Sequence, residues 1–116
     1  TVPDEGRQVP QYLAVDRAGN QEADFTHIRV FTWWVKNHRY VTAYAESGLQ
    51  GYFPIRAATT GNVPYFRLNL VDENGNKIQK VYGLFSTITR PLGFVEGWES
   101  NAMPTNPPSP RGRRRR

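Results

Sequence analysis

Hydrophobic and polar residues alternate with a period of two through the middle of the chain, which is the pattern of half-buried β-strands. The segment 25–45, FTHIRVFTWWVKNHRYVTAYA, is also rich in the β-branched and aromatic residues that favour strands. One face of its first half carries Ile28, Val30, Thr32 and Trp34, and the other carries Arg29, Phe31, Trp33 and Val35. The polar residues 36–39 predict a hairpin loop, and residues 40–45 predict the returning strand.

A second hairpin is predicted further along the chain. Residues 65–71 alternate, and Asn74-Gly75 then signals a type I′ turn, which needs positive φ at both central residues. The return strand is expected to begin at Ile78 and to end near Ile88. The stretch FRLNLVDENGNKI…LFSTITRP is similar to a hairpin of immunoglobulin-like sandwiches, including DNA-binding domains of the Rel type. The resemblance implies the fold class and carries over no functional residue.

Shorter segments complete the predicted sheets. Residues 51–58 predict a short strand, and Pro54 favours an edge or a bulge for it. Residues 12–15 predict one further edge strand. Pro91 and Gly93 are expected to interrupt the pattern before a last apolar piece, and no window has a helical period.

About five to seven short strands in one chain predict an all-β fold. We expect a single antiparallel β-sandwich, Ig-like or jelly-roll-like, or a small barrel. The expected divisions are a flexible N-terminal arm at 1–24, a β-domain at 25–100, and a proline-rich spacer with a disordered arginine tail at 101–116.

The excess positive charge lies at the C-terminal end. The chain has 15 Lys and Arg against 10 Asp and Glu, a net charge of +5, and five of its last six residues are arginine. Without those five, residues 1–110 hold ten basic and ten acidic side chains and are formally neutral. The sequence therefore predicts a neutral body with a cationic appendage rather than a basic domain.

The arginine run is the first candidate site, because each guanidinium offers a planar fork of donors that matches phosphate. We expect non-specific contact with nucleic acid, RNA or DNA, and a steep dependence of affinity on salt. The predicted contact residues are Arg111, Arg113, Arg114, Arg115 and Arg116. Alternatives are a nuclear address, a protease cleavage signal, and an end that raises solubility or binds anionic membrane weakly.

Aromatic residues of the strands are the second candidate site. Adjacent rings such as Trp33-Trp34 point to opposite faces of a strand, so one ring of each pair meets a second layer or the surface. An exposed ring beside an arginine can stack on single-stranded nucleic acid or anchor a protein interface. The neutral body favours a two-sided core or a subunit interface. The aromatic contact face is predicted to hold Trp33, Tyr40, Tyr44 and Tyr52.

The sequence offers no catalytic, metal or cofactor motif. Without cysteine there are no disulfides, no thiol catalysis and no cysteine-built zinc site. His27 and His38 lack metal-ligand spacing, and the DENGN stretch lacks the spacing of a calcium loop. Glu96 and Glu99 make only a weak carboxylate pair. We therefore expect a non-catalytic protein without a cofactor, and no stretch approaches the roughly 18 apolar residues of a membrane span.

These features together favour a structural or assembly β-domain. It would pack with partner subunits, in a homo- or hetero-oligomer, and contact nucleic acid through its tail, as virion and ribonucleoprotein components do. The expected location is then a virion, the cytoplasm or the nucleus. The alternative is an extracellular or surface Ig-like recognition module whose arginine run is a proteolytic processing site.

Overall fold

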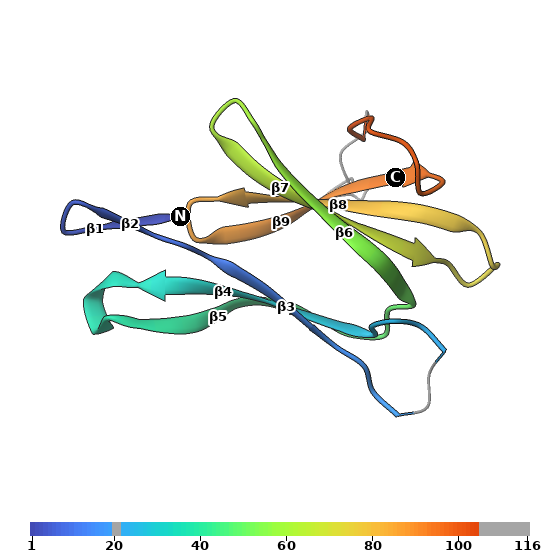
Figure 1. Cartoon of the computed structure of the whole chain (residues 1–116), viewed down its shortest axis with the longest axis horizontal. Helices are drawn as coiled ribbons and strands as arrows, with labels where there is room; N and C mark the ends of the chain where they lie inside the picture. The colour runs from blue at the N-terminus through green and yellow to red at the C-terminus, as the bar shows by residue number, and fades with distance from the viewer. Residues whose placement is uncertain (20–21, 105–116) are drawn as a thin grey trace, which may run out of the picture.

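The computed structural model describes residues 1–19 and 22–104, which form three antiparallel sheets and no α-helix (Figure 1). The first sheet is the hairpin of β1 (Val2–Asp4) and β2 (Arg7–Val9). The second holds β3 (Tyr12–Asp16), β4 (His27–Trp34) and β5 (Arg39–Glu46), with the 3-10 turn η1 (Val35–Asn37) before β5. The third holds β6 (Gly51–Thr60), β7 (Val63–Val71), β8 (Lys77–Phe85) and β9 (Ile88–Glu96).

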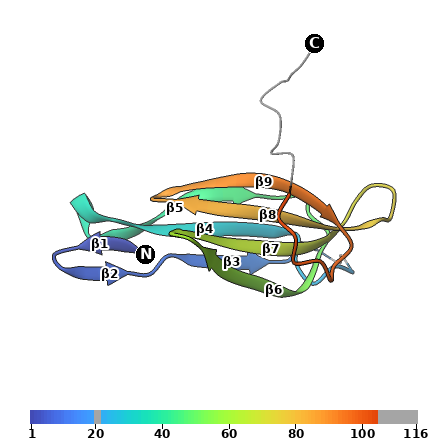
Figure 2. The same cartoon turned by 90° about the horizontal axis from the view of Figure 1, so that it is seen from above.

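The two larger sheets lie one over the other and share one hydrophobic core (Figures 1 and 2). The alternating apolar residues predicted at 28 and 30 point into this core from β4, and those at 66, 68 and 70 point into it from β7. Seen from above, β3 and β6 lie along one side of the molecule, and β5 and β9 along the other (Figure 2). The strand pattern of the sequence thus predicts the all-β class correctly, and in β4 and β7 one of the two alternating sets of residues faces the core.

The order of the strands differs from the expected fold types. Within each larger sheet the strands follow chain order, and the described chain passes between these two sheets once, from β5 to β6. Ig-like and jelly-roll sandwiches instead use Greek-key connections. The described strands have neither order, because hydrophobic alternation fixes which residues form strands but not which sheet each strand joins.

Both predicted edge strands lie at sheet edges. The apolar run at 12–15 is β3, the outermost strand of the three-stranded sheet, and the run at 51–58 is β6, the outermost strand of the other. The pairing of β6 with β7 shifts register between Tyr52 and Arg56, on either side of Pro54. Proline is tolerated there because an edge strand leaves one row of backbone groups unpaired.

The hairpin predicted at Asn74-Gly75 is present, but its turn is not type I′. Gly75 has φ +81, whereas Asn74 is not among the residues with positive φ. The carboxylate of Asp72 accepts hydrogen bonds from the backbone N–H groups of Asn74 and Asn76, both at 2.9 Å. This side-chain acceptor stabilises a wider loop than the two-residue turn.

The return strand expected to end near Ile88 is in fact two strands. β8 ends at Phe85, and the chain turns at Ser86, with φ +60, into β9, which continues through Pro91. The turn contains neither glycine nor proline, so the sequence gives no signal for it. Pro91 does not end β9, because β9 is an edge strand with a register shift opposite Val81 and Tyr82.

The N-terminal segment is folded rather than a flexible arm over its described part. Val2 and Asp4 of β1 are buried, and the indole N–H of Trp33 donates to Asp4 Oδ2 at 2.7 Å. The sequence pattern did not predict β1 and β2, because each is short and has few apolar residues to alternate. The boundaries between arm, β-domain and tail stay a prediction.

A seam joins the two larger sheets where Phe25 meets Gly51. The Gly51 N–H donates to the Phe25 carbonyl at 2.9 Å, and the Phe25 N–H donates back at 3.2 Å. Phe25 is fully buried, and a Cβ at position 51 would overlap its ring. Only glycine lets the backbone approach the ring this closely.

Candidate functional site

The predicted tail site lies outside the described residues, which end at Pro104. It comprises Arg111, Arg113, Arg114, Arg115 and Arg116. The segment that leads to it, residues 98–103, is described and is called the strap below. The strap folds back over the outer face of the four-stranded sheet (Figures 1 and 2).

The structure does not bring the four predicted aromatic contacts together. Trp33 and Tyr40 are cross-strand partners on the outer face of the three-stranded sheet, with ring centroids 5.1 Å apart. Tyr44 points inward and packs against Tyr82 at 5.8 Å, although strict alternation would put it beside Tyr40. A register shift after Val30 in the β4–β5 pairing reverses its side.

The fourth aromatic residue, Tyr52, belongs to the other sheet. Its ring packs on Trp98 of the strap, with centroids 5.3 Å apart. Tyr52 therefore contacts the strap and does not share a sheet face with Trp33. The placement of Tyr52 depends on which sheet its strand joins, and alternation in the sequence does not predict that.

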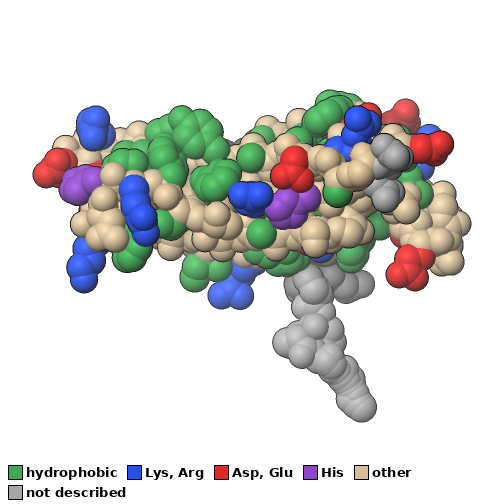
Figure 3. Space-filling model, turned by 90° about the horizontal axis from the view of Figure 1, so that it is seen from below, with side chains coloured by type: hydrophobic (Ala, Val, Ile, Leu, Met, Phe, Trp, Pro, Cys, Tyr) green, Lys and Arg blue, Asp and Glu red, His purple; other side chains and the backbone are tan. Residues whose placement is uncertain are grey.

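The outer face of the three-stranded sheet combines hydrophobic side chains with charges of both signs (Figure 3). The exposed ring of Tyr12 lies 5.3 Å from that of Tyr40 and extends the aromatic row begun by Trp33. Asp16 carries a carboxylate 3.3 Å from His27 and 4.0 Å from Arg29. Positive and negative groups thus offset one another on this side of the molecule.

The outer face of the four-stranded sheet is different, because its strand-borne charges are all positive. Arg56 and Arg67 are cross-strand partners there, and the alternation of β8 and β9 puts Lys77 and Arg90 on the same side. Glu96, the one acidic residue in β6–β9, pairs with the inward-facing Ile78. We call this outer surface the cationic face, and its residues are Arg56, Arg67, Lys77 and Arg90.

Arg67 fixes the strap to the middle of the cationic face. Its side chain is buried, with 3 % exposure, and its guanidinium donates to Gln79 Oε1 at 2.9 Å. The same group donates to the backbone carbonyls of Asn101 and Ala102 at 2.9 and 2.6 Å. Arg67 therefore occupies its donors with neutral acceptors, most of them from the strap.

Further bonds hold the first residue and the middle of the strap. Arg56 donates to the Ser100 carbonyl at 2.8 Å and to Asn101 Oδ1. The Trp98 carbonyl accepts from Gln79 Nε2 at 2.6 Å, and the Trp98 indole donates to the Leu70 carbonyl at 2.9 Å. The start of the basic tail is thus attached to one defined face of the body.

No carboxylate of the described residues lies within ion-pair distance of Arg56 or Arg67. Carbonyl dipoles accept hydrogen bonds from both terminal nitrogens of Arg67 but leave its formal charge uncompensated. Buried charges in proteins are usually paired, because an unpaired charge loses its hydration without an opposite charge in return. The pair of guanidinium groups is therefore a local excess of positive charge within a neutral body.

Other kinds of site receive no support from the described part of the chain. It contains no group of three or more histidine or acidic side chains that could hold a metal ion. It contains no helix that is long and apolar enough to span a membrane. The chain matches no known protein family, no curated protein and no solved structure.

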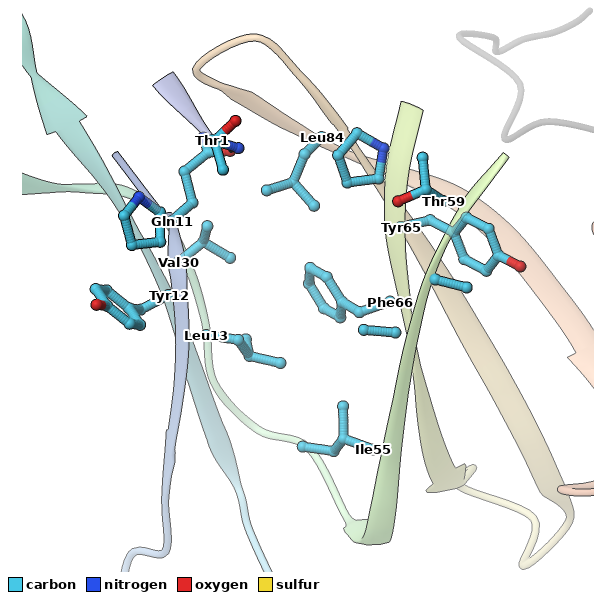
Figure 4. A pocket seen from close by; sticks show the side chains of 14 residues that line it. Thr1, Gln11, Tyr12, Leu13, Val30, Ile55, Thr59, Tyr65, Phe66 and Leu84 are labelled. Carbon is cyan, nitrogen blue, oxygen red and sulfur yellow. The ribbon is translucent and has the colours of Figure 1, made fainter. Parts of the chain in front are cut away.

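An apolar cleft of about 460 Å³ opens between the edge strands β3 and β6 (Figure 4). Leu13 and Val30 line it from one sheet, and Ile55 and Phe66 line it from the other. At one end Gln11 Nε2 donates to the Ser86 carbonyl at 3.0 Å and links the two sheets. The cleft offers surface for packing but no charged side chain for chemistry.

A polar cluster closes the core on the side of β5. Glu46 accepts hydrogen bonds from the hydroxyls of Tyr44 and Tyr82, at 2.8 and 2.7 Å, and from Lys80 Nζ at 2.9 Å. Burial acts to raise the pKa of Glu46, but the bonds from Lys80 and both tyrosines outweigh it and lower the pKa overall. Burial first, and the bond to Glu46 second, raise the pKa of the Tyr82 hydroxyl. The cluster is an internal support rather than an accessible site.

Proposed function

We propose that this protein is a non-catalytic assembly domain that contacts nucleic acid non-specifically through its arginine tail. One observation carries the proposal: the strap begins the tail on the cationic face, the outer sheet face on which every strand-borne charge is positive. Tail and face would then attract the same polyanion from one side, and phosphate contacts of this kind need no base recognition.

The remaining surfaces are proposed to meet protein partners in a virion-like or ribonucleoprotein assembly. The row of Tyr12, Tyr40 and Trp33 supplies aromatic side chains of the kind that anchor interfaces. In this proposal the two larger sheets act as one sandwich-type domain, in contact along β5 and β9 and open along β3 and β6. The open side adds apolar area for a subunit contact.

The test is binding of single-stranded RNA and DNA across a salt series, for the full chain and for a chain ending at Pro110. We expect the shortened chain to lose most of its affinity. The slope of log affinity against log salt should fall by up to about 3.5, since each phosphate contact on a single strand contributes roughly 0.7. Equal affinity and equal slope for the two chains would reject the tail as the contact.

The processing-site alternative makes a different prediction. We expect the intact mass of the protein from its natural source to correspond then to a chain that ends before Arg116, or to one cut from a precursor directly after the arginine run. A natural protein that keeps the whole run and shows no cleavage after it favours the nucleic-acid proposal instead.

A further inference from the structure

We propose that a pocket on the cationic face binds a backbone phosphate of a nucleic-acid strand. The pocket has a volume of about 310 Å³ and is lined by Arg56, Ala57, Ala58, Tyr65, Arg67 and Asn101. The inference deepens the proposed function and rests on it for the choice of nucleic acid as the source of the phosphate. It adds a site on the folded body to the contact made by the tail.

The first argument is charge. Arg56 and Arg67 are direct cross-strand partners, a position in which like charges destabilise a sheet. Both arginines line one pocket, and no described carboxylate pairs with either of them. A phosphate would supply the missing negative charge.

The second argument is the division of labour between the two arginines. Arg67 is buried and held by Gln79 and the strap carbonyls, so its charge is fixed in place beside the pocket. Arg56 is only partly buried, and its acceptors are the Ser100 carbonyl and the exposed side chain of Asn101. Asn101 can yield its place to a phosphate oxygen, which accepts a stronger, charge-assisted bond from the same donor.

The third argument is the aromatic wall of the pocket. Tyr65 lines both the apolar cleft and this pocket, and its ring extends to the opposite side of the strand from the Phe66 ring (Figure 4). The Arg67 guanidinium carbon lies 5.7 Å from the centroid of the Tyr65 ring. A ring beside paired arginines suits a nucleotide, because a base can stack next to its bound phosphate. An isolated inorganic phosphate would leave this ring unused.

The experiment follows backbone amide signals of the full chain by NMR during titration with an eight-nucleotide oligouridylate, and separately with inorganic phosphate. The oligonucleotide should shift the amides of Ala57, Ala58 and Asn101. Arg56→Gln should weaken oligonucleotide binding by about tenfold and abolish those shifts, since it removes the exposed donor fork. Arg56→Lys, which keeps the charge without the fork, should fall between the two.

Arg29→Gln is the matched control, because it removes the same charge from the outer face of the other sheet. It should change the affinity by less than about twofold, the effect expected for a surface charge remote from the contact. Equal losses for Arg56→Gln and Arg29→Gln would overturn the pocket. A well-dispersed spectrum of each variant shows that loss of binding is not loss of the fold.

The failure of this inference is separable from that of the tail. Oligonucleotide binding with the three pocket amides unmoved overturns the pocket and leaves the tail contact standing. Pocket shifts in a chain whose affinity and salt slope do not depend on the arginine run support the pocket and overturn the tail. Shifts with inorganic phosphate but none with the oligonucleotide overturn the strand as the source of the phosphate.

Discussion

The outer faces of the two larger sheets are built alike but carry charge differently. On the three-stranded sheet Arg29 lies near Asp16, so the positive group has a negative neighbour. On the four-stranded sheet Arg56 and Arg67 face each other with no described carboxylate in reach, and a strap of backbone carbonyls covers them. The formal neutrality of residues 1–110 thus conceals one mixed face and one cationic face. The net charge of a β-protein does not predict how charge is distributed over its surface, because strand pairing decides which side chains share a face.

The largest expected effect is on stability and falls on the cationic face. Arg67→Ala should lower the free energy of unfolding by about 4 kcal/mol, because it leaves Gln79 and several strap carbonyls without their donor. Arg29→Ala, on the mixed face, should cost less than about 0.5 kcal/mol. Urea denaturation of both variants measures the difference. Similar losses of unfolding free energy in Arg67→Ala and Arg29→Ala would contradict the proposed difference between the two faces.

The next effect tests the seam between Phe25 and Gly51, which joins the two larger sheets. Gly51→Ala should lower the free energy of unfolding by about 3 kcal/mol, because the added methyl group overlaps the buried ring of Phe25. Gly61→Ala is the control: its φ of +61 also disfavours a side chain, but nothing lies near its Cβ. It should cost about 1 kcal/mol. Equal melting temperatures for Gly51→Ala and Gly61→Ala would contradict the close approach of the Gly51 backbone to the Phe25 ring.

The smallest of the three effects concerns the cluster between the sheets. Glu46→Gln should lower the free energy of unfolding at pH 7 by about 2 kcal/mol, below the usual loss for a broken buried pair because Glu46 and Lys80 keep some contact with water. Glu73→Gln, in the exposed 72–76 turn, should change it by less than about 0.5 kcal/mol.

The same cluster should make the free energy of unfolding decrease as the pH falls into the acid range. The pKa of Glu46 is lowered on folding, so its stabilisation is complete above the ordinary value of 4.5 and is lost as the pH falls from there through the lower pKa of the folded state. Glu46→Gln should therefore lose less stability than the natural protein over this interval. Denaturation at several pH values checks it, and parallel curves for the two proteins would contradict the assignment.

Alternation in the sequence predicted most of the longer strands, but it could not predict how the residues of the site come together. It puts Phe66 and Arg67 on opposite sides of one strand, and in the structure Phe66 packs in the core while Arg67 lies on the outer face, because a strand's two sides are a local property. It misplaced Tyr44, because a register shift reversed the strand's facing. The bond between Arg67 and Asn101 spans 34 residues, and no local pattern encodes a contact of that range. The cationic face likewise exists only once β6 to β9 are known to be neighbours.

The strap also determines where a mechanical load enters the fold. By covalent connection alone, tension on the tail would act at the end of β9, an edge strand that could be peeled away one hydrogen bond at a time. Because the strap turns back to Arg67 on β7, that tension first meets side chains anchored in an interior strand. A pull on the tail must therefore break several bonds between Arg67 and the strap together before it can reach the edge strand β9.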